Sequence, residues 1–468
     1  MMTRLRLFFI GLAGLLLAAC GTAQPMPTTT SIAQVQVTDT PVLPTATVTT
    51  LLVTNTATPT ATAVPPTATA TPLPTSTPTA TPVPLPPPTG RIYFFWDPTP
   101  FNNAGVPSTA PKRNLYVAVP GNTPSEWHID TLLDQSMDWS QEAPWSPEAA
   151  LSPDLTKLAF TVWKDANGDG DIHSDQGGDL TTIYVYSLFD QKLTQLTDYA
   201  PLSFFSLSWL PDNQSLAYSW GKEVYTVDIN NSFSQTITPS FPQNVETVMA
   251  SPDGQLITVV SRGNLFFFDW KTTDITPVLT NQINHGNMTW DPNSQWFVTN
   301  ENSSMGLLAI NTRTYEVFSL VESGVFSYPT WAPDGSKLSF TRGGVDNPGL
   351  FLWDPNTQQI TQIYDHLVFP IWSSDNTKLA VSFVQDTVTN LAIVDVTTGE
   401  IQKLLSAPDT EIFTVLTWSP DGLWILFLVE REETLGLYVL NQENSSTYLI
   451  FEFPKDSVRP NHFFWLPE

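Results

Sequence analysis

The stretch Thr330-Trp331-Ala332-Pro333-Asp334-Gly335-Ser336-Lys337-Leu338-Ser339-Phe340 decides the fold of this 468-residue chain. It predicts the end of one β-strand, a tight turn and the start of the next strand, because proline presets φ and Asp-Gly tolerates the left-handed geometry that follows. A close copy lies at 416–427 (LTWSPDGLWILF), looser copies occur elsewhere, and a truncated copy ends at Glu468. One such unit cannot bury its own apolar face, so we expect the copies to stack.

The copies align on the proline of the turn and recur at spacings of 40 to 58 residues. The aligned position is occupied by Pro153, Pro211, Pro252, Pro292, Pro333, Ser374, Pro420 and Pro467. Two residues earlier, six of the eight copies carry a tryptophan, namely Trp209, Trp290, Trp331, Trp372, Trp418 and Trp465. The other two copies carry Leu151 and Ala250. We interpret the tryptophans as structural wedges between adjacent sheets, because an indole covers a wide apolar area.

Each turn is followed by an apolar strand, a third strand and a shorter fourth strand, and four strands in roughly 40 residues are typical of a β-propeller blade. His462–Glu468 predicts a first strand with nothing after it, whereas Gly90–Trp96, Asn114–Val119 and Trp127–Leu133 predict three strands with no first strand before them. We therefore expect the N- and C-terminal strands to share one blade, which leaves no free sheet edge at the join. The predicted fold is all-β, a single propeller with eight four-stranded blades, or seven if residues 91–133 form no blade.

The repeated W-x-P-D-G motif resembles the WD40-like PD40 repeats of TolB-type β-propellers. The motif is clearest at Trp331–Gly335 and Trp418–Gly422, and Ser251–Gly254 matches it without the tryptophan. The Gly-His and Trp-Asp signatures of true WD40 repeats are not repeated. The resemblance covers residues 91–468 and implies a propeller that contacts other proteins in the cell envelope.

The first 20 residues predict export and lipid anchoring. Arg4 and Arg6 precede the apolar run Leu7–Leu17, which is short for a membrane span and has the flanks of a signal peptide. The end of this run, Leu17–Cys20 (LAAC), resembles the bacterial lipobox, which implies that Cys20 is lipidated and becomes the mature N-terminus. Cys20 is the only cysteine, so disulfides and a cysteine nucleophile are excluded from the folded part. An ordinary signal peptide with an incidental cysteine is the alternative.

Residues 21–90 predict an extended stalk. They contain 15 prolines and a single charged residue, Asp39. Proline removes amide donors and restricts φ, so polyproline II with interspersed coil is expected. The chain is thus divided into a signal peptide (1–20), a Thr/Pro/Ala-rich stalk (21–90) and a propeller (91–468) held outside the cytoplasm. The composition of the stalk also resembles that of O-glycosylated stalks.

An insertion in the second repeat predicts a calcium site. The segment Asp165–Gln176 (DANGDGDIHSDQ) places side-chain oxygens at positions 1, 3, 5 and 7 and glycine at position 6. This is the opening pattern of EF-hand and dockerin loops, whose alternate residues point inward towards Ca²⁺. The predicted ligands are Asp165, Asn167, Asp169, Asp171 and Asp175. Gln176 stands where the bidentate acid is expected, and a solvated loop without metal is the alternative.

Charge and motifs limit the function classes. The net charge of −26, from 19 Lys and Arg against 45 Asp and Glu, disfavours nucleic acid, whose phosphates need cations. No H-E-x-x-H, phosphate-loop or G-x-S-x-G motif occurs.

We expect a monomeric, non-enzymatic propeller that binds an envelope or extracellular protein or a polysaccharide, and meets the membrane only through its lipid anchor. The alternative is a carbohydrate-active enzyme or sugar-binding protein with acidic residues at the axial cleft. Three loop aromatics, Phe101, Tyr199 and Phe241, could line a ligand surface or pack at the rim.

Overall fold

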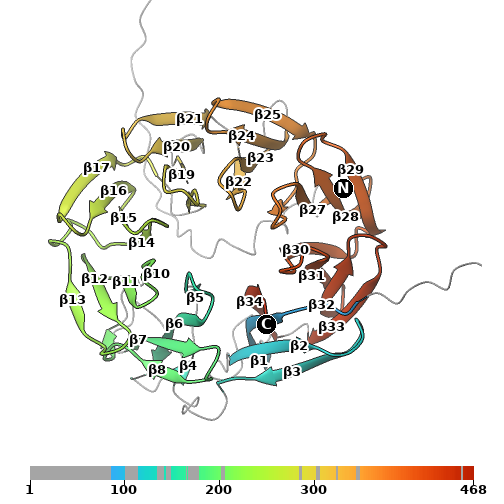
Figure 1. Cartoon of the computed structure of the whole chain (residues 1–468), viewed down its shortest axis with the longest axis horizontal. Coiled ribbons are helices and arrows are strands. Elements are labelled where there is room, and N and C mark those ends of the chain that lie inside the picture. Colours follow the sequence, from blue (N-terminus) through green and yellow to red (C-terminus); the bar gives the residue numbers. More distant parts are fainter. Residues whose placement is uncertain are drawn as a thin grey trace, which may run out of the picture. The chain divides into compact units, whose positions relative to one another are not determined.

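The computed structural model describes residues 86–100, 114–133, 142–143, 149–164, 166, 179–201, 206–283, 287–301, 306–322, 325–343, 348–454 and 457–468. Their strands form eight sheets arranged in a ring, so the prediction of an eight-bladed all-β propeller is confirmed and the seven-bladed alternative is wrong (Figure 1). The described residues contain no helix, and therefore none long and apolar enough to cross a membrane.

In each blade the first-named strand lies nearest the centre of the ring and the others follow outward. Blade 1 contains β34 (Ser457–Leu466), β1 (Arg91–Pro100), β2 (Asn114–Pro120) and β3 (Trp127–Thr131). Blade 2 contains β5 (Ala149–Leu151), β6 (Lys157–Lys164), β7 (Leu180–Ser187) and β8 (Leu193–Gln195), and the short strands β4 (Glu142–Ala143) and β9 (Ala200–Pro201) pair with β6 and β7. Blade 3 contains β10 (Leu207–Trp209), β11 (Ser215–Trp220), β12 (Glu223–Asp228) and β13 (Ser234–Thr236). Blade 4 contains β14 (Thr247–Ala250), β15 (Leu256–Ser261), β16 (Asn264–Asp269) and β17 (Asp274–Leu279).

The other four blades follow the same antiparallel order. Blade 5 contains β18 (Thr289–Trp290), β19 (Trp296–Asn300), β20 (Leu307–Asn311) and β21 (Val317–Val321). Blade 6 contains β22 (Val325–Trp331), β23 (Leu338–Gly343), β24 (Gly349–Asp354) and β25 (Gln359–Tyr364). Blade 7 contains β26 (Ile371–Trp372), β27 (Lys378–Gln385), β28 (Val388–Asp395) and β29 (Ile401–Pro408). Blade 8 contains β30 (Ile412–Trp418), β31 (Trp424–Glu430), β32 (Thr434–Asn441) and β33 (Thr447–Pro454).

Blade 1 closes the ring with strands from both ends of the propeller, as predicted. The C-terminal strand β34 pairs with β1, and Trp465 lies opposite Ile92. Gly90 precedes β1 with φ of 85°, and a Cβ at this position would collide with the carbonyl of Leu466. A glycine at this position therefore allows the close approach of the two chain segments.

The hydrophobic core is divided into eight clusters, one at each junction between neighbouring blades. Strand β1 shows how a strand serves two of them. Ile92 and Phe94 pack towards blade 8, whereas Tyr93 and Phe95 pack towards blade 2. Successive side chains point to opposite faces of a sheet, so a strand buried on both faces has no alternation of polar and apolar residues.

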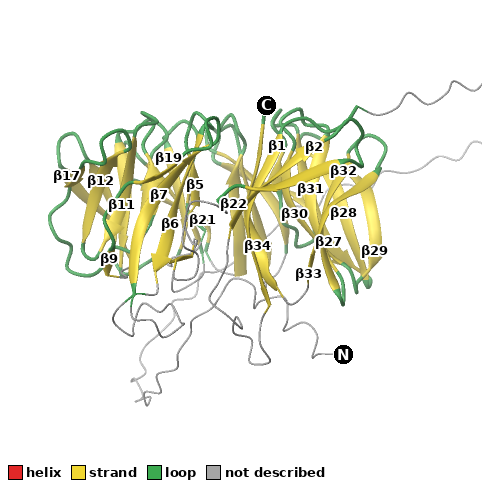
Figure 2. Ribbon diagram, turned by 90° about the horizontal axis from the view of Figure 1, so that it is seen from below, coloured by secondary structure: helices red, strands yellow, loops and turns green. Residues whose placement is uncertain are grey.

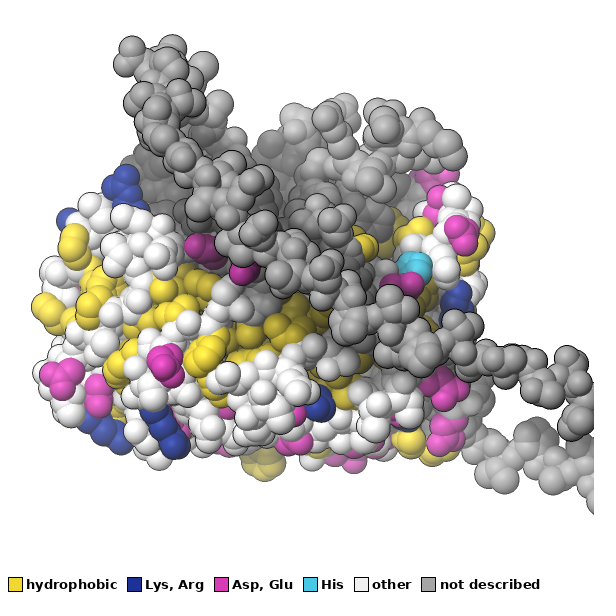
Figure 3. All heavy atoms as spheres, turned by 90° about the horizontal axis from the view of Figure 1, so that it is seen from above, with side chains coloured by type: hydrophobic (Ala, Val, Ile, Leu, Met, Phe, Trp, Pro, Cys, Tyr) yellow, Lys and Arg dark blue, Asp and Glu magenta, His cyan; other side chains and the backbone are white. Residues whose placement is uncertain are grey.

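One face of the ring carries the C-terminus, and one side of it exposes hydrophobic side chains. The C-terminus lies on the face that carries the turns following the inner strands (Figure 2). On the side formed by β17, β21 and β25, hydrophobic side chains gather in a band and acidic side chains are scattered along the rim (Figure 3). Val317 and Ile360, from β21 and β25, are each more than 40 % exposed (42 % and 43 %).

Candidate functional site

The repeated tryptophans lie between blades, at the inner end of six of the eight junctions. Each is at most 8 % exposed and packs in the cluster between its own blade and the preceding one. Four of them donate the indole N–H to an inner-strand carbonyl of the preceding blade: Trp209 to Ala150 (2.9 Å), Trp290 to Met249 (3.4 Å), Trp372 to Thr330 (3.0 Å) and Trp418 to Ile371 (3.0 Å). Each indole thus fills its junction and also links two blades by a hydrogen bond.

The remaining two tryptophans depart from this pattern. Trp465 donates its Nε1–H to the carbonyl of Thr89 (2.8 Å), and the Thr89 hydroxyl donates to Asp421 in blade 8 (2.8 Å). The residues before β1 therefore supply the acceptor at the junction where the ring closes. The Nε1 of Trp331 is buried and has no hydrogen-bond partner among the described residues.

Serine hydroxyls replace the indole at the junction of blades 3 and 4. In this junction Ala250 occupies the tryptophan position on β14. The backbone amide of Ala250 donates to the Ser208 hydroxyl (3.0 Å), and that of Val248 donates to the Ser206 hydroxyl (3.1 Å). These short side chains connect β10 to β14, but they fill much less volume than an indole.

A pocket of about 590 Å³, which we call the axial pocket, opens beside this break in the tryptophan pattern. It is lined by the inner strands β5, β10 and β14, which face the centre of the ring in Figure 1, and by the turns that follow them. Leu151 and Ala250, which stand where the other repeats carry tryptophan, both contribute to its wall. The flexible side chains of Met249 and Met288 also line it. No charged side chain is among the lining residues that the structure describes. The pocket therefore suits an uncharged group that makes apolar contacts and a few hydrogen bonds.

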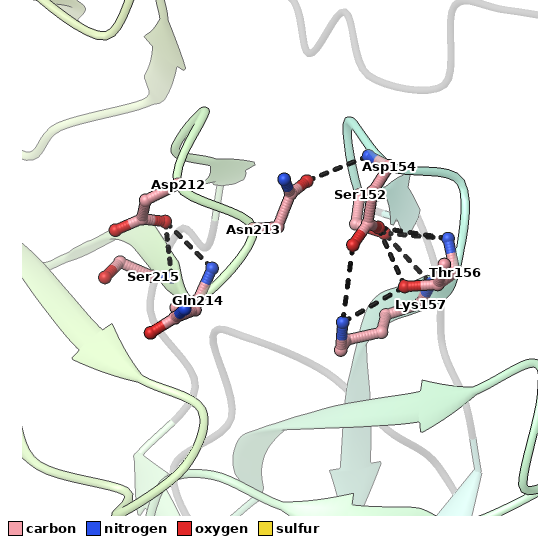
Figure 4. Close-up of polar contacts among 8 residues, drawn as sticks. All are labelled: Ser152, Asp154, Thr156, Lys157, Asp212, Asn213, Gln214 and Ser215. Atoms are coloured by element: carbon pink, nitrogen blue, oxygen red, sulfur yellow. Dashed lines mark hydrogen bonds and ion pairs between the residues drawn. The ribbon is translucent and has the colours of Figure 1, made fainter.

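Hydrogen bonds between neighbouring turns hold the rim of this pocket (Figure 4). The Asn213 side chain of blade 3 accepts a hydrogen bond from the backbone amide of Asp154 in blade 2 (2.8 Å). Within blade 2, the Ser152 hydroxyl donates to Asp154 (2.6 Å). Partial burial disfavours the ionised form of Asp154, but hydrogen bonds from Ser152 and Thr156 outweigh it and lower the pKa of this carboxyl. The turn is thus held by a side chain that is charged at neutral pH.

Several predicted site residues lie outside the described part of the chain. They are the lipidation site Cys20 and the calcium ligands Asp165, Asn167, Asp169, Asp171 and Asp175. The insertion that contains these ligands connects β6 to β7 in blade 2. Within the described ranges, no three or more His, Cys, Asp or Glu side chains are grouped so that they could hold a metal ion.

The three aromatic residues predicted in loops lie in different environments. Phe241 is buried between blades 3 and 4, Tyr199 lines a groove between blades 2 and 3, and Phe101 lies outside the described residues. The pocket itself was not anticipated from the sequence. Its signal was present in the alignment, because Leu151 and Ala250 are the two positions that lack the tryptophan.

No family model and no curated protein matches the chain. Among solved structures, dihydro-heme d1 dehydrogenase NirN is 12 % identical, with a TM-score of 0.51 over 80 % of this chain and 74 % of that chain. TolB from Acinetobacter baumannii is 15 % identical, with a TM-score of 0.35 over 62 % of this chain and 80 % of that chain. An oligogalacturonate lyase in complex with manganese is 16 % identical, with a TM-score of 0.38 over 66 % of this chain and 84 % of that chain. Identities this low show the fold alone, and the chain is an eight-bladed β-propeller with TolB among its structural neighbours.

Proposed function

We propose that this protein is an exported, lipid-anchored binding module, and that its axial pocket receives an uncharged, mainly apolar segment of a partner protein. The observation that carries the proposal is the break in the tryptophan pattern at Ala250, beside which the inner wall opens into a pocket. At the six tryptophan positions, selection for a closed ring is enough to explain the residue. A small residue that leaves space needs another explanation, and binding supplies one.

The chemistry of the wall favours recognition over catalysis. Backbone groups, serine hydroxyls and two methionine side chains can fix an apolar group without any proton transfer. A glycosidase requires two carboxyl groups, about 5–10 Å apart, on either side of the bond that is cleaved. The described lining of the pocket contains neither Asp nor Glu. No specific observation therefore favours the carbohydrate-active alternative over binding.

Anchoring is supported by the sequence of the N-terminus. A lipobox at Leu17–Cys20 and a proline-rich stalk would hold the propeller outside the cytoplasm, where envelope proteins are its available partners. We expect Cys20→Ser to move the protein from the membrane fraction to the soluble fraction. Recovery of Cys20→Ser in the membrane fraction, at the level of the unsubstituted protein, would argue against a lipid anchor.

The binding proposal is tested by restoring the repeat. Ala250→Trp introduces the residue that six other blades carry, and the carbonyl of Ser208 is the equivalent acceptor in the preceding blade. We expect the indole to fill the pocket, keep the fold and abolish capture of partner proteins from envelope extracts. Phe189→Trp is the control, because Phe189 is 94 % exposed and lies outside the pocket. Equal capture of the same proteins by Ala250→Trp and the unsubstituted protein, with both folded, would refute the proposal.

A further inference from the structure

A second cavity, of about 620 Å³, lies between blades 2 and 3, away from the axial pocket. Its blade 2 wall comes from the segment that follows β8, including Asp198 and Tyr199. Its blade 3 wall contains Tyr218, Trp220 and Tyr225 from β11 and β12, together with two serines from β13 and the turn before it. Four aromatic side chains therefore line one cavity, which we call the aromatic groove.

The blade 3 aromatics form a continuous platform. The rings of Tyr218 and Tyr225 are stacked, with centroids 5.3 Å apart and planes 18° apart. The Trp220 ring lies 6.1 Å from Tyr225 at an angle of 49°, and Trp220 is 37 % exposed. An exposed tryptophan set at an angle to a tyrosine platform presents two ring faces to whatever enters the groove.

One acidic side chain lies in the groove and a second lies beside it. The Tyr225 hydroxyl donates to Glu223 (2.7 Å), and the Glu223 carboxylate also accepts from Ser240 (2.5 Å). These hydrogen bonds from Ser240 and Tyr225 lower the pKa of Glu223, so the carboxylate is ionised at neutral pH. Burial, together with the bond to Glu223, raises the pKa of Tyr225, whose phenol remains a donor. Asp198 is the acidic residue of the described lining, which contains no Lys or Arg, and Glu223 lies beside the lining through its hydrogen bond with Tyr225.

One aromatic ring of the groove already attracts a cation from its own chain. The Lys164 ammonium lies 5.1 Å from the centroid of the Tyr199 ring. Ring faces carry partial negative charge and attract ammonium groups within about 6 Å, most strongly when the cation is weakly hydrated. The net charge of −26 would further raise the local concentration of cations.

We propose that the aromatic groove is a binding site for an alkylammonium group, such as a quaternary ammonium ion or a lysine side chain of a partner protein. Trp220 and Tyr225 supply the ring faces, and Asp198 and Glu223 supply the charge that complements the cation. This site is independent of the axial pocket and of the partner proposed for it.

The test compares two probes of the same shape. Choline and 3,3-dimethylbutan-1-ol differ in having a charged nitrogen or a neutral carbon at the centre of the bulky group. We expect saturation-transfer NMR on the full chain to give choline an affinity about tenfold higher than its neutral analogue. Raising the salt concentration should weaken choline binding and leave the analogue unaffected. Equal binding of the two probes, or no binding of choline, would overturn the proposal.

Substitutions locate the site. Trp220→Ala should abolish choline binding, and Glu223→Gln should weaken it several-fold while the neutral analogue is unaffected. Phe189→Ala, an exposed aromatic outside the groove, should change neither. Choline binding that survives both groove variants would place the cation elsewhere and refute the assignment. Parallel titrations with Nα-acetyl-lysinamide and its Nε-trimethyl form then distinguish a partner's lysine from a quaternary ammonium ligand.

Discussion

The ring consists of two regions that use the same repeat differently. From the junction of blades 4 and 5 round to that of blades 8 and 1, which we call the regular arc, every junction contains a repeat tryptophan. Between blades 1 and 4, which we call the variant arc, two of three junctions lack it. The axial pocket and the aromatic groove both involve the variant arc. Repeat residues therefore build the ring, and the axial pocket opens where two of its junctions depart from the repeat.

The largest effect is expected where the regular arc closes on blade 1. Deletion of His462–Glu468 removes three of the six β34 residues that pair with β1 (Phe464, Trp465 and Leu466), and with them the hydrogen bond from Trp465 to Thr89. Loss of the closing strand exposes a sheet edge and the cluster between blades 8 and 1. We expect the single cooperative unfolding transition to be lost, as measured by calorimetry. Deletion of the exposed pair Pro467–Glu468 alone is the control, and an unchanged melt of the longer truncation would refute closure by β34.

Substitution of two tryptophans in the regular arc distinguishes the contribution of the indole hydrogen bond to stability from that of indole packing. Trp418→Phe removes a donor to the Ile371 carbonyl, whereas Trp331→Phe removes an N–H that has no partner among the described residues. Both variants lose similar apolar area, so their difference reports the inter-blade bond. We expect Trp418→Phe to cost about 1–3 kcal/mol more than Trp331→Phe in the free energy of unfolding, measured by denaturant titration. Equal costs would show that the indole acts through packing alone.

The sequence predicts the regular arc well because each of its features is local or repeated. Proline-containing turns, apolar strands and a half-blade at each end are sufficient to derive eight blades and their closure. The two cavities depend on contacts between segments from different blades. Tyr199 and Trp220 come from different blades, and an alignment cannot show that they line one cavity. Nor can the identity of Ala250 show whether its neighbours fill the space left by the tryptophan.

The calcium prediction concerns the insertion in the variant arc. If Asp165–Gln176 binds Ca²⁺ with the millimolar to submillimolar affinity of extracellular loops, Ca²⁺ at about 1 mM should stabilise the protein by about 0.4–1.4 kcal/mol. Thermal melts with Ca²⁺ and with a chelator measure this difference, and Mg²⁺ at equal ionic strength controls for screening. Asp169→Ala should remove the difference. A melt that does not respond to Ca²⁺ would leave the insertion as a solvated loop.

A buried acid in the regular arc should give a smaller, pH-dependent effect. In blade 5, Asp291 accepts from the Trp296 amide (2.7 Å), a role that a serine hydroxyl such as that of Ser251 plays in other turns. Burial raises the pKa of Asp291 above its ordinary value of 3.8, although backbone hydrogen bonds oppose this. The folded state therefore binds the proton more tightly than the unfolded state, and stability falls as pH rises above 3.8 through the raised pKa.

We expect Asp291→Ser to stabilise the protein by about 1 kcal/mol at neutral pH. The gain should shrink as pH falls through the raised pKa and then below 3.8, where the wild-type carboxyl is protonated in both states. Denaturant titrations at several pH values measure it. Asp291→Asn keeps the shape and the Oδ1 acceptor for the Trp296 amide but loses the Oδ2 acceptor for the Asn293 amide, so its gain should be smaller and follow the same pH dependence. A gain that is independent of pH in both variants would show that the charge of Asp291 is not responsible.

The smallest effect is expected in the turn of blade 2, where the variant arc keeps the backbone of the repeat but departs from it in residue type. Leu155 has a φ of 61°, at a turn position that Gly254 and Asn213 occupy in the next blades with φ of 66° and 58°. Left-handed geometry is unfavourable for leucine and tolerated by asparagine, and Leu155 is 43 % exposed, so little packing is lost on replacement. We expect Leu155→Asn to raise stability by about 0.5–1 kcal/mol, seen as a small rise in Tm. Leu155→Ala removes the same apolar surface but keeps a side chain that disfavours positive φ. If alanine stabilises as much as asparagine, the benefit comes from the lost surface, and the backbone of this turn is not strained.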